Sequence, residues 1–237
     1  MKKVMIAALS AALVFIVIFY FLWKTMPPQE QSVFAPQRYE QHVLVIDAGH
    51  GGEDGGAVSL SGASESTINL AIALKLDQIL GLYGAPSVML RTEDRSLHSS
   101  EAKTLREKKV SDLHNRVETV NETEHAILLS IHQNSFPQSK YHGAQVFYSP
   151  TQDSLEFATY LQQVLRETLD TQNQRSAAPI PDSVYLMNHI RCPGILVECG
   201  FLSNPTEDQL LQTPEYQLMV AMTLSGAYLQ YLDTPKG

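Results

Sequence analysis

VLVIDAGHGG, residues 43–52, joins a run of apolar and β-branched residues to a glycine-rich turn. A short apolar run that ends at glycines predicts a strand buried on both faces, as strands of parallel sheets are. Two later segments, AILLSI at 126–131 and GILVE at 194–198, have the same character. We therefore expect buried strands over 43–47, 126–131 and 194–198.

Helical patterns separate these strands. Ile68 and Ile72 recur on one face of a helix that opens at Glu65, whereas residues 92–112 are polar and show no clear pattern. Alternating strands and helices predict an α/β fold, with a twisted, mostly parallel sheet of about six strands flanked by helices on both faces. The other expected strands cover 87–91, 145–148 and 183–186, and the other helices lie around 113–120, 161–169 and 214–232.

Residues that can bind a metal or carry a proton follow the buried strands. His50 comes after the first strand, His132 directly after the third, and Glu198 ends the sixth. Glu65 opens the helix that follows the first strand. Because ligands bind beyond the carboxyl ends of parallel strands, we expect these side chains to converge at one edge of the sheet.

Imidazole and carboxylate groups are good zinc ligands, and three protein ligands with one open position are typical of catalytic zinc. Zinc lowers the pKa of a bound water to about 7, and a carboxylate that does not touch the metal can carry that water's proton. His50, Glu65 and His132 are therefore the expected ligands of one zinc ion. Glu198 follows three apolar residues, where burial of an unpaired charge is costly, so it is the expected proton carrier.

Each of these residues alone has a simpler interpretation. A histidine near a glycine-rich turn is commonly structural, and Glu65 at a helix N-terminus interacts favourably with the helix dipole without any metal. The glycines around His50 also resemble a phosphate-binding loop, but the P-loop lysine and the G-x-G-x-x-G spacing are absent. Manganese or iron would accept the same nitrogen and oxygen ligands.

Composition sets bounds on these interpretations. The chain has 237 residues, 44% hydrophobic and 18% charged, which fits one globular catalytic domain, expected over residues 42–234. The net charge is -8 and there is no basic stripe, so nucleic acid is not an expected partner.

Cys192 and Cys199 flank a predicted strand that would hold them too far apart for a disulfide, so both are expected to be free thiols.

The amino terminus carries a long apolar run over residues 4–23, closed by Lys24. About 20 apolar residues span a bilayer, whereas the apolar part of a signal peptide usually has ~7–15 residues. Residues 1–25 are therefore expected to be a membrane anchor or, alternatively, a cleaved export signal, and both place the rest of the chain outside the cytoplasm. Residues 26–41, rich in proline and polar side chains, are typical of a linker.

Four motifs follow one another along the chain. They are VIDAGHGG at 45–52, Glu65 before Asn69-Leu70, SIHQN at 130–134 and LVECGFLSN at 196–204. Together they resemble the zinc-dependent N-acetylmuramoyl-L-alanine amidases of bacterial cell walls. The resemblance implies one zinc ion on His50, Glu65 and His132. Glu198 would be the catalytic carboxylate in hydrolysis of the amide between N-acetylmuramic acid and L-alanine in peptidoglycan. Asn134 is a candidate for substrate binding, with a structural role as the alternative.

An apolar amino-terminal segment followed directly by the catalytic domain is similar to the germination-specific amidases of spore formers. That subtype implies removal of stem peptides from spore cortex before muramic lactam forms, at the forespore membrane or cortex. The interval from His132 to Glu198 shows no long extra helix, so the inhibitory helix of some family members is not expected. Alternatives are another zinc peptidase or deacetylase acting on the wall, and a catalytically silent wall-binding module. The sequence leaves a protein partner open.

Overall fold

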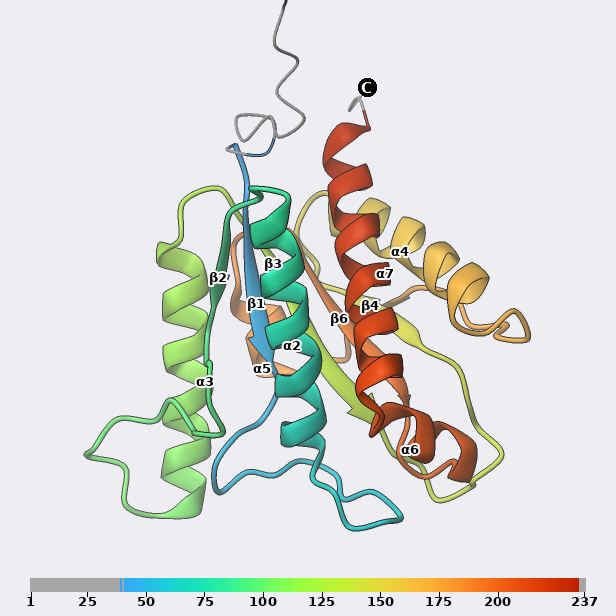
Figure 1. The fold of residues 1–237 in the computed structure, drawn as a ribbon. Coiled ribbons are helices and arrows are strands. Elements are labelled where there is room, and N and C mark those ends of the chain that lie inside the picture. The colour runs from blue at the N-terminus through green and yellow to red at the C-terminus, as the bar shows by residue number, and fades with distance from the viewer. Residues whose placement is uncertain (1–38, 40, 235–237) are drawn as a thin grey trace, which may run out of the picture. The chain divides into compact units, whose positions relative to one another are not determined.

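The structure, a computed structural model, describes residue 39 and residues 41–234 (Figure 1). The strands are β1 (Val43–Ala48), β2 (Ser87–Met89), β3 (Ala126–Asn134), β4 (Gln145–Tyr148), β5 (Ala178–Pro179) and β6 (Gly194–Phe201). They form one sheet in the order β2-β1-β3-β6-β4-β5. Neighbouring strands run parallel except β4 and β6, which are antiparallel. The expectation of a mostly parallel sheet of about six strands is confirmed.

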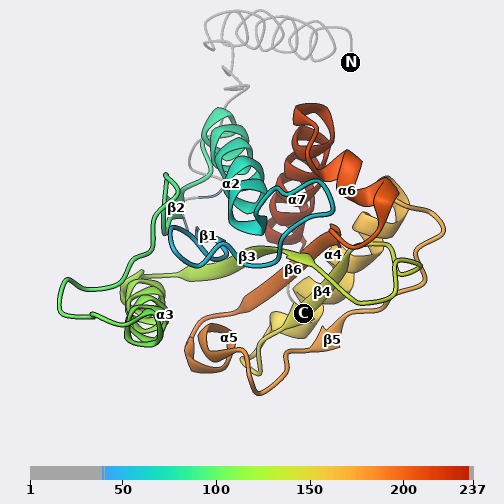
Figure 2. The same ribbon diagram turned by 90° about the horizontal axis from the view of Figure 1, so that it is seen from below.

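The helices are α2 (Glu65–Leu82), α3 (Leu105–Glu122), α4 (Ser154–Thr168), α5 (Tyr185–His189), α6 (Pro205–Leu211) and α7 (Pro214–Asp233). Figure 2 shows α2 and α7 on one face of the sheet and α3 and α5 on the other. The helix α4 packs against α7 and β4. Helices therefore cover both faces, as the alternating sequence pattern predicted.

The two faces of the sheet contribute to separate apolar cores. The larger core joins α2, α4 and α7 to one face, which includes Leu44 and Ile46 of β1. The smaller core lies on the face of α3 and α5 and includes Val45 and Leu128. Because successive side chains of a strand point to opposite faces, β1 supplies both cores, and this explains its continuous run of apolar residues.

The parallel register brings the ends of the strands together. Ala48 of β1 pairs with Ile131 of β3, and His132 pairs with Glu198 of β6. The loop after β1 therefore starts beside His132 and Glu198, at the carboxyl edge of the sheet where α/β proteins bind their ligands.

The predicted strand over 183–186 is wrong, because this segment enters the short helix α5. The side chain of Asn188 donates to the carbonyl oxygens of Pro181 and Val184 and closes the turn that leads into the helix. A short apolar run does not distinguish a strand from a helical turn. The strand β5 lies a few residues earlier and pairs with β4 at the edge of the sheet.

Residues 92–112, which carry no clear sequence pattern, include the start of α3. Thr104 and Glu107 form a capping box at its N-terminus. The side chain of each accepts a hydrogen bond from the backbone N–H of the other. The helix then continues through the predicted segment 113–120. The short helix α6 was not predicted.

Cys192 and Cys199 are free, as predicted, and Cys199 is buried. The predicted anchor over 1–25 lies outside the described residues, as does the predicted linker over 26–41 apart from residues 39 and 41. In the part of the chain that the structure describes, no helix combines the length and the apolar character needed to cross a membrane.

Candidate metal centre

Three potential metal ligands converge at the carboxyl edge of the sheet. His50 lies in the loop after β1, Glu65 opens α2 and His132 belongs to β3. One ligand atom of each residue lies within 4.8 Å of the other two. The rings of His50 and His132 are 5.0 Å apart and meet edge to face. The structure therefore brings together the three side chains that the sequence singled out as ligands.

Glu65 is the centre of this group. Its Oε1 accepts hydrogen bonds from His132 Nδ1 at 2.9 Å and from the backbone N–H of Gln133 at 3.1 Å. Its Oε2 accepts one from the backbone N–H of Ala57 at 2.9 Å and lies 3.4 Å from His50 Nε2. Burial raises the pKa of Glu65, but the hydrogen bonds with the two histidines hold it well below its usual range. The carboxylate is therefore ionised and fixed between two imidazoles.

Asp54 orients the ring of His50. Its Oδ2 lies 3.0 Å from His50 Nδ1 and 3.2 Å from Lys109 Nζ. A metal-binding histidine commonly gives its second ring N–H to a carboxylate, so this contact leaves Nε2 for a metal. Burial lowers the pKa of His50, but its hydrogen bonds with Asp54 and Glu65 raise that pKa to about 9. The sequence interpretation missed Asp54, although a carboxylate in the same short loop as a candidate ligand was a usable signal.

Two buried arginines hold the backbone that carries His50. Arg91 donates to the carbonyl oxygens of Ala48 and Ser66, both at 2.8 Å, and so connects the loop after β1 to the first turn of α2. Arg116 of α3 donates to the carbonyl oxygen of His50 at 2.8 Å. The two arginines are 1% and 2% exposed, so these bonds are shielded from water. They fix the separation between the loop of His50 and the helix of Glu65.

Carboxylates neutralise Arg116. Asp47 at the end of β1 and Asp112 on α3 both form ion pairs with its guanidinium, and Ser130 of β3 donates to Asp47 at 2.6 Å. Burial raises the pKa of Asp47, but the charges of Arg116 and His132 and the hydrogen bonds from Ser130 and Arg116 together hold it below its usual value. The sequence interpretation missed this network, because only the folded chain brings β1, β3 and α3 together.

Glu198 lies on the strand next to His132. One carboxyl oxygen, Oε2, is buried and has no hydrogen-bond partner. Burial raises the pKa of Glu198 to about 7, although the charge of His132 opposes this rise. A carboxyl group with a pKa near neutrality can both accept and donate a proton, which general acid–base catalysis requires.

Glu198 and the histidines line a cavity of about 190 Å³. The apolar wall comes from α5 and the residue before it, with Val184, Leu186 and Met187. The other wall comes from α3 and includes Lys109. The segment that was wrongly predicted as a strand therefore forms one side of the site.

Asn134 lies two residues beyond His132 on β3 and pairs with Phe201 of β6. The register between β3 and β6 shifts between His132 and Asn134, so the pairing that aligns His132 with Glu198 does not continue to Asn134. It is not among the residues that line the cavity of Glu198. Its role in substrate binding stays a prediction.

The donor set fits a divalent metal ion. Two imidazoles and one carboxylate are typical of catalytic zinc with an open fourth position, and the unpartnered oxygen of Glu198 adds a proton acceptor. The chain also keeps the space around these ligands clear. A Cβ added at Gly56 would lie 2.5 Å from Glu65 Oε2 and 2.7 Å from His50 Cδ2. A glycine at this position lets the loop approach both side chains.

Known proteins are similar to this chain in sequence and in fold. Residues 44–227 match the family described as N-acetylmuramoyl-L-alanine amidase. The germination-specific N-acetylmuramoyl-L-alanine amidase of Bacillus subtilis (strain 168) is 37% identical over 196 residues, which are 82% of this chain and 81% of that protein.

Two solved structures show the same fold. The CwlD amidase from Clostridioides difficile, solved in complex with the GerS lipoprotein, is 39% identical with a TM-score of 0.77, covering 81% of this chain and 98% of that one. The N-acetylmuramoyl-L-alanine amidase from Clostridium difficile 630 is 27% identical with a TM-score of 0.70, and the match covers 82% of this chain and 98% of that one. With its four motifs gathered at one sheet edge, the chain belongs to the N-acetylmuramoyl-L-alanine amidase family of enzymes.

Proposed function

We propose that this amidase is zinc-dependent, with one zinc ion on His50, Glu65 and His132, and that it releases stem peptides from peptidoglycan. The observation that supports the proposal most strongly is the buried, unpartnered carboxyl oxygen of Glu198 beside these three side chains. A module that only binds the wall has no use for a costly buried proton carrier. A catalytic role for Glu198 is therefore favoured over a silent binding module.

The residues divide the chemistry between them. A zinc ion bound here would activate a water molecule and polarise the carbonyl of the muramyl amide. Glu198 accepts the proton of the attacking water and then donates it to the alanine nitrogen, so that the stem peptide leaves as a neutral amine. Asp54 holds the side chain of His50 in place, and Arg116 holds its backbone carbonyl group.

We propose that spore cortex peptidoglycan is the substrate, and that stem peptides are removed before muramic lactam forms. The 37% identity to a germination-specific amidase over 82% of this chain supports this. The enzyme would act outside the cytoplasm, at the forespore membrane or cortex. Residues 1–25 would be the anchor or export signal, 26–41 the linker and 42–234 the catalytic domain, with Asn134 contacting the substrate.

The test is digestion of purified peptidoglycan, from vegetative walls and from spore cortex, by the purified zinc-loaded protein. Mass spectrometry of the products should show free stem peptides that begin with L-alanine. Deacetylated sugars would instead identify a deacetylase, and cuts within the stem would identify a peptidase. Reloading the metal-free protein with zinc, manganese or iron, one at a time, shows which metal restores the products.

The affinity for zinc should depend steeply on pH. His50 has a pKa of about 9 without metal, raised by Asp54 and Glu65, and zinc must displace its proton. We expect the dissociation constant to rise about tenfold for each pH unit below 9. Competition against a chelator whose own pH dependence is known measures this between pH 6 and 9.

Asp54→Asn is the matched control, since the amide can still accept from His50 but no longer carries the charge that raises its pKa. The pH below which the zinc dissociation constant rises should then move down from about 9 toward 6.5, the ordinary pKa of histidine. If zinc affinity in the unaltered protein were constant from pH 6 to 9, His50 would not be a zinc ligand.

A further inference from the structure

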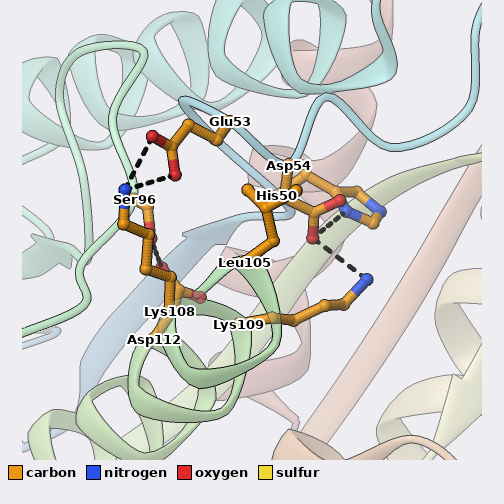
Figure 3. Close-up of a pocket in the computed structure, with 9 residues that line it drawn as sticks. His50, Glu53, Asp54, Ser96, Leu105, Lys108, Lys109 and Asp112 are labelled. Carbon is orange, nitrogen blue, oxygen red and sulfur yellow. Dashed lines mark hydrogen bonds and ion pairs between the residues drawn. The ribbon is translucent and has the colours of Figure 1, made fainter. Parts of the chain in front are cut away.

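A second cavity adjoins the metal centre along α3. It shares four lining residues with the cavity of Glu198, so the two cavities lie next to each other along α3. Figure 3 shows Lys108 and Lys109 reaching from α3 toward the loop that follows β1, with Leu105 between them. The shared residues are His50, Asp54, Lys109 and Asp112.

Three lysine and arginine side chains line these two cavities, and they differ in how many of their donors are already used. Arg116 is buried and bonded to two carboxylates and two carbonyl oxygens. Lys108 Nζ donates to both carboxyl oxygens of Glu53, at 2.7 and 2.8 Å. Among the residues that the structure describes, Lys109 Nζ contacts Asp54 alone, at 3.2 Å, and its side chain is 57% exposed. An ammonium group has three donors, so Lys109 is the cation that can bind a further anion.

Lys109 also lies close to the expected reaction centre. The oxygen of Asp54 that it contacts lies 3.0 Å from His50 Nδ1, so two contacts separate its ammonium from a proposed zinc ligand. A group bound by Lys109 would belong to the part of the substrate next to the scissile amide.

The substrate carries a fitting anion at that place. In peptidoglycan the L-alanine of the stem is followed by D-glutamate joined through its side-chain carboxyl, so the α-carboxyl is either a free carboxylate or, in some walls, an amide. Consecutive α-carbons are about 3.8 Å apart, which puts this group one residue beyond the alanine nitrogen. Resting on the amidase function, we propose that Lys109 binds this carboxylate and makes the enzyme prefer stems in which it is free.

The test compares two disaccharide–tripeptide fragments that differ only at this carboxyl group, one free and one amidated. The ratio of their kcat/KM values is measured for the zinc-loaded full-length protein and for Lys109→Met. The unaltered protein should prefer the free acid by about two- to fivefold, mostly through KM, as expected for a partly exposed ion pair. Lys109→Met should bring the ratio close to one, and Lys109→Arg should keep the preference.

The ratio separates substrate recognition from metal binding. If Lys109→Met also weakened zinc binding through Asp54, that effect would lower kcat/KM equally for both substrates. Weaker zinc binding would therefore not by itself alter their ratio. Lys103→Met removes an exposed lysine outside both cavities and should leave the ratio as it is. Equal cleavage of both substrates by the unaltered protein would overturn this proposal and leave the amidase intact. Cleavage of neither substrate by the zinc-loaded protein would overturn the amidase function and this proposal with it.

Discussion

Glu198→Gln should lower kcat by about 10²–10⁴-fold while zinc remains bound. Glutamine keeps the shape of the side chain but cannot accept the proton of the attacking water or return it to the leaving nitrogen. The three proposed ligands, His50, Glu65 and His132, are untouched, so zinc content measured by elemental analysis should stay at one per chain. Release of stem peptides, followed by mass spectrometry, gives the rate.

The stability of the metal-free variant provides a second readout. The pKa of Glu198 rises from an ordinary value of 4.5 to about 7 on folding, chiefly through burial. A carboxyl with a raised pKa binds its proton more tightly in the folded state, so stability is lost as the pH rises from about 4.5 to about 7. The loss approaches about 3 kcal/mol above pH 7. Glutamine has no proton to lose, so Glu198→Gln should unfold at a higher temperature than the unaltered protein at pH 8.

These two results together assign the proton carrier. A variant that is folded, zinc-loaded and inactive supports Glu198 in that role. If Glu198→Gln kept its rate within tenfold of the unaltered protein, another group would have to move the proton.

The central buried strands and the potential ligands were predictable from the sequence for one physical reason. A strand buried on both faces needs a continuous apolar run, so β1, β3 and β6 stand out from the polar segments between them. Polar residues at the ends of such runs must then lie at the sheet edge. The order of residues alone therefore places His50, His132 and Glu198 together, and Glu65 follows as the first residue of the next helix.

The wall of the site was not predictable in the same way. The segment of α5 is too short for a helical period, and its place over the cavity depends on contacts with α3 far away in the sequence. Arg91 ends an expected strand and Arg116 lies in a polar stretch, and at both places an arginine is usually exposed. Their burial is compensated by carbonyl oxygens and by Asp47 and Asp112, which only the folded chain brings within reach.

Gly49 shows how closely the loop after β1 approaches the metal centre. Its backbone does not have a positive φ, so an alanine would be tolerated on conformational grounds. A Cβ at this position would, however, overlap the imidazole ring of His132. The need for glycine here is therefore steric and concerns one proposed ligand.

Gly49→Ala should lower the affinity for zinc by about 10–100-fold and reduce amidase activity accordingly, because the ring of His132 must turn away from Glu65 to make room. Gly81→Ala in α2 is the matched control, since a Cβ there meets nothing within 4 Å and stability should change by no more than about 1 kcal/mol. Zinc affinity from chelator competition and unfolding temperature are measured for both variants. A Gly49→Ala protein that is folded but binds zinc weakly places His132 in the coordination shell. If it bound zinc as tightly as the unaltered protein, the position of the His132 ring would not matter to the metal, and the ligand set of His50, Glu65 and His132 would have to be revised.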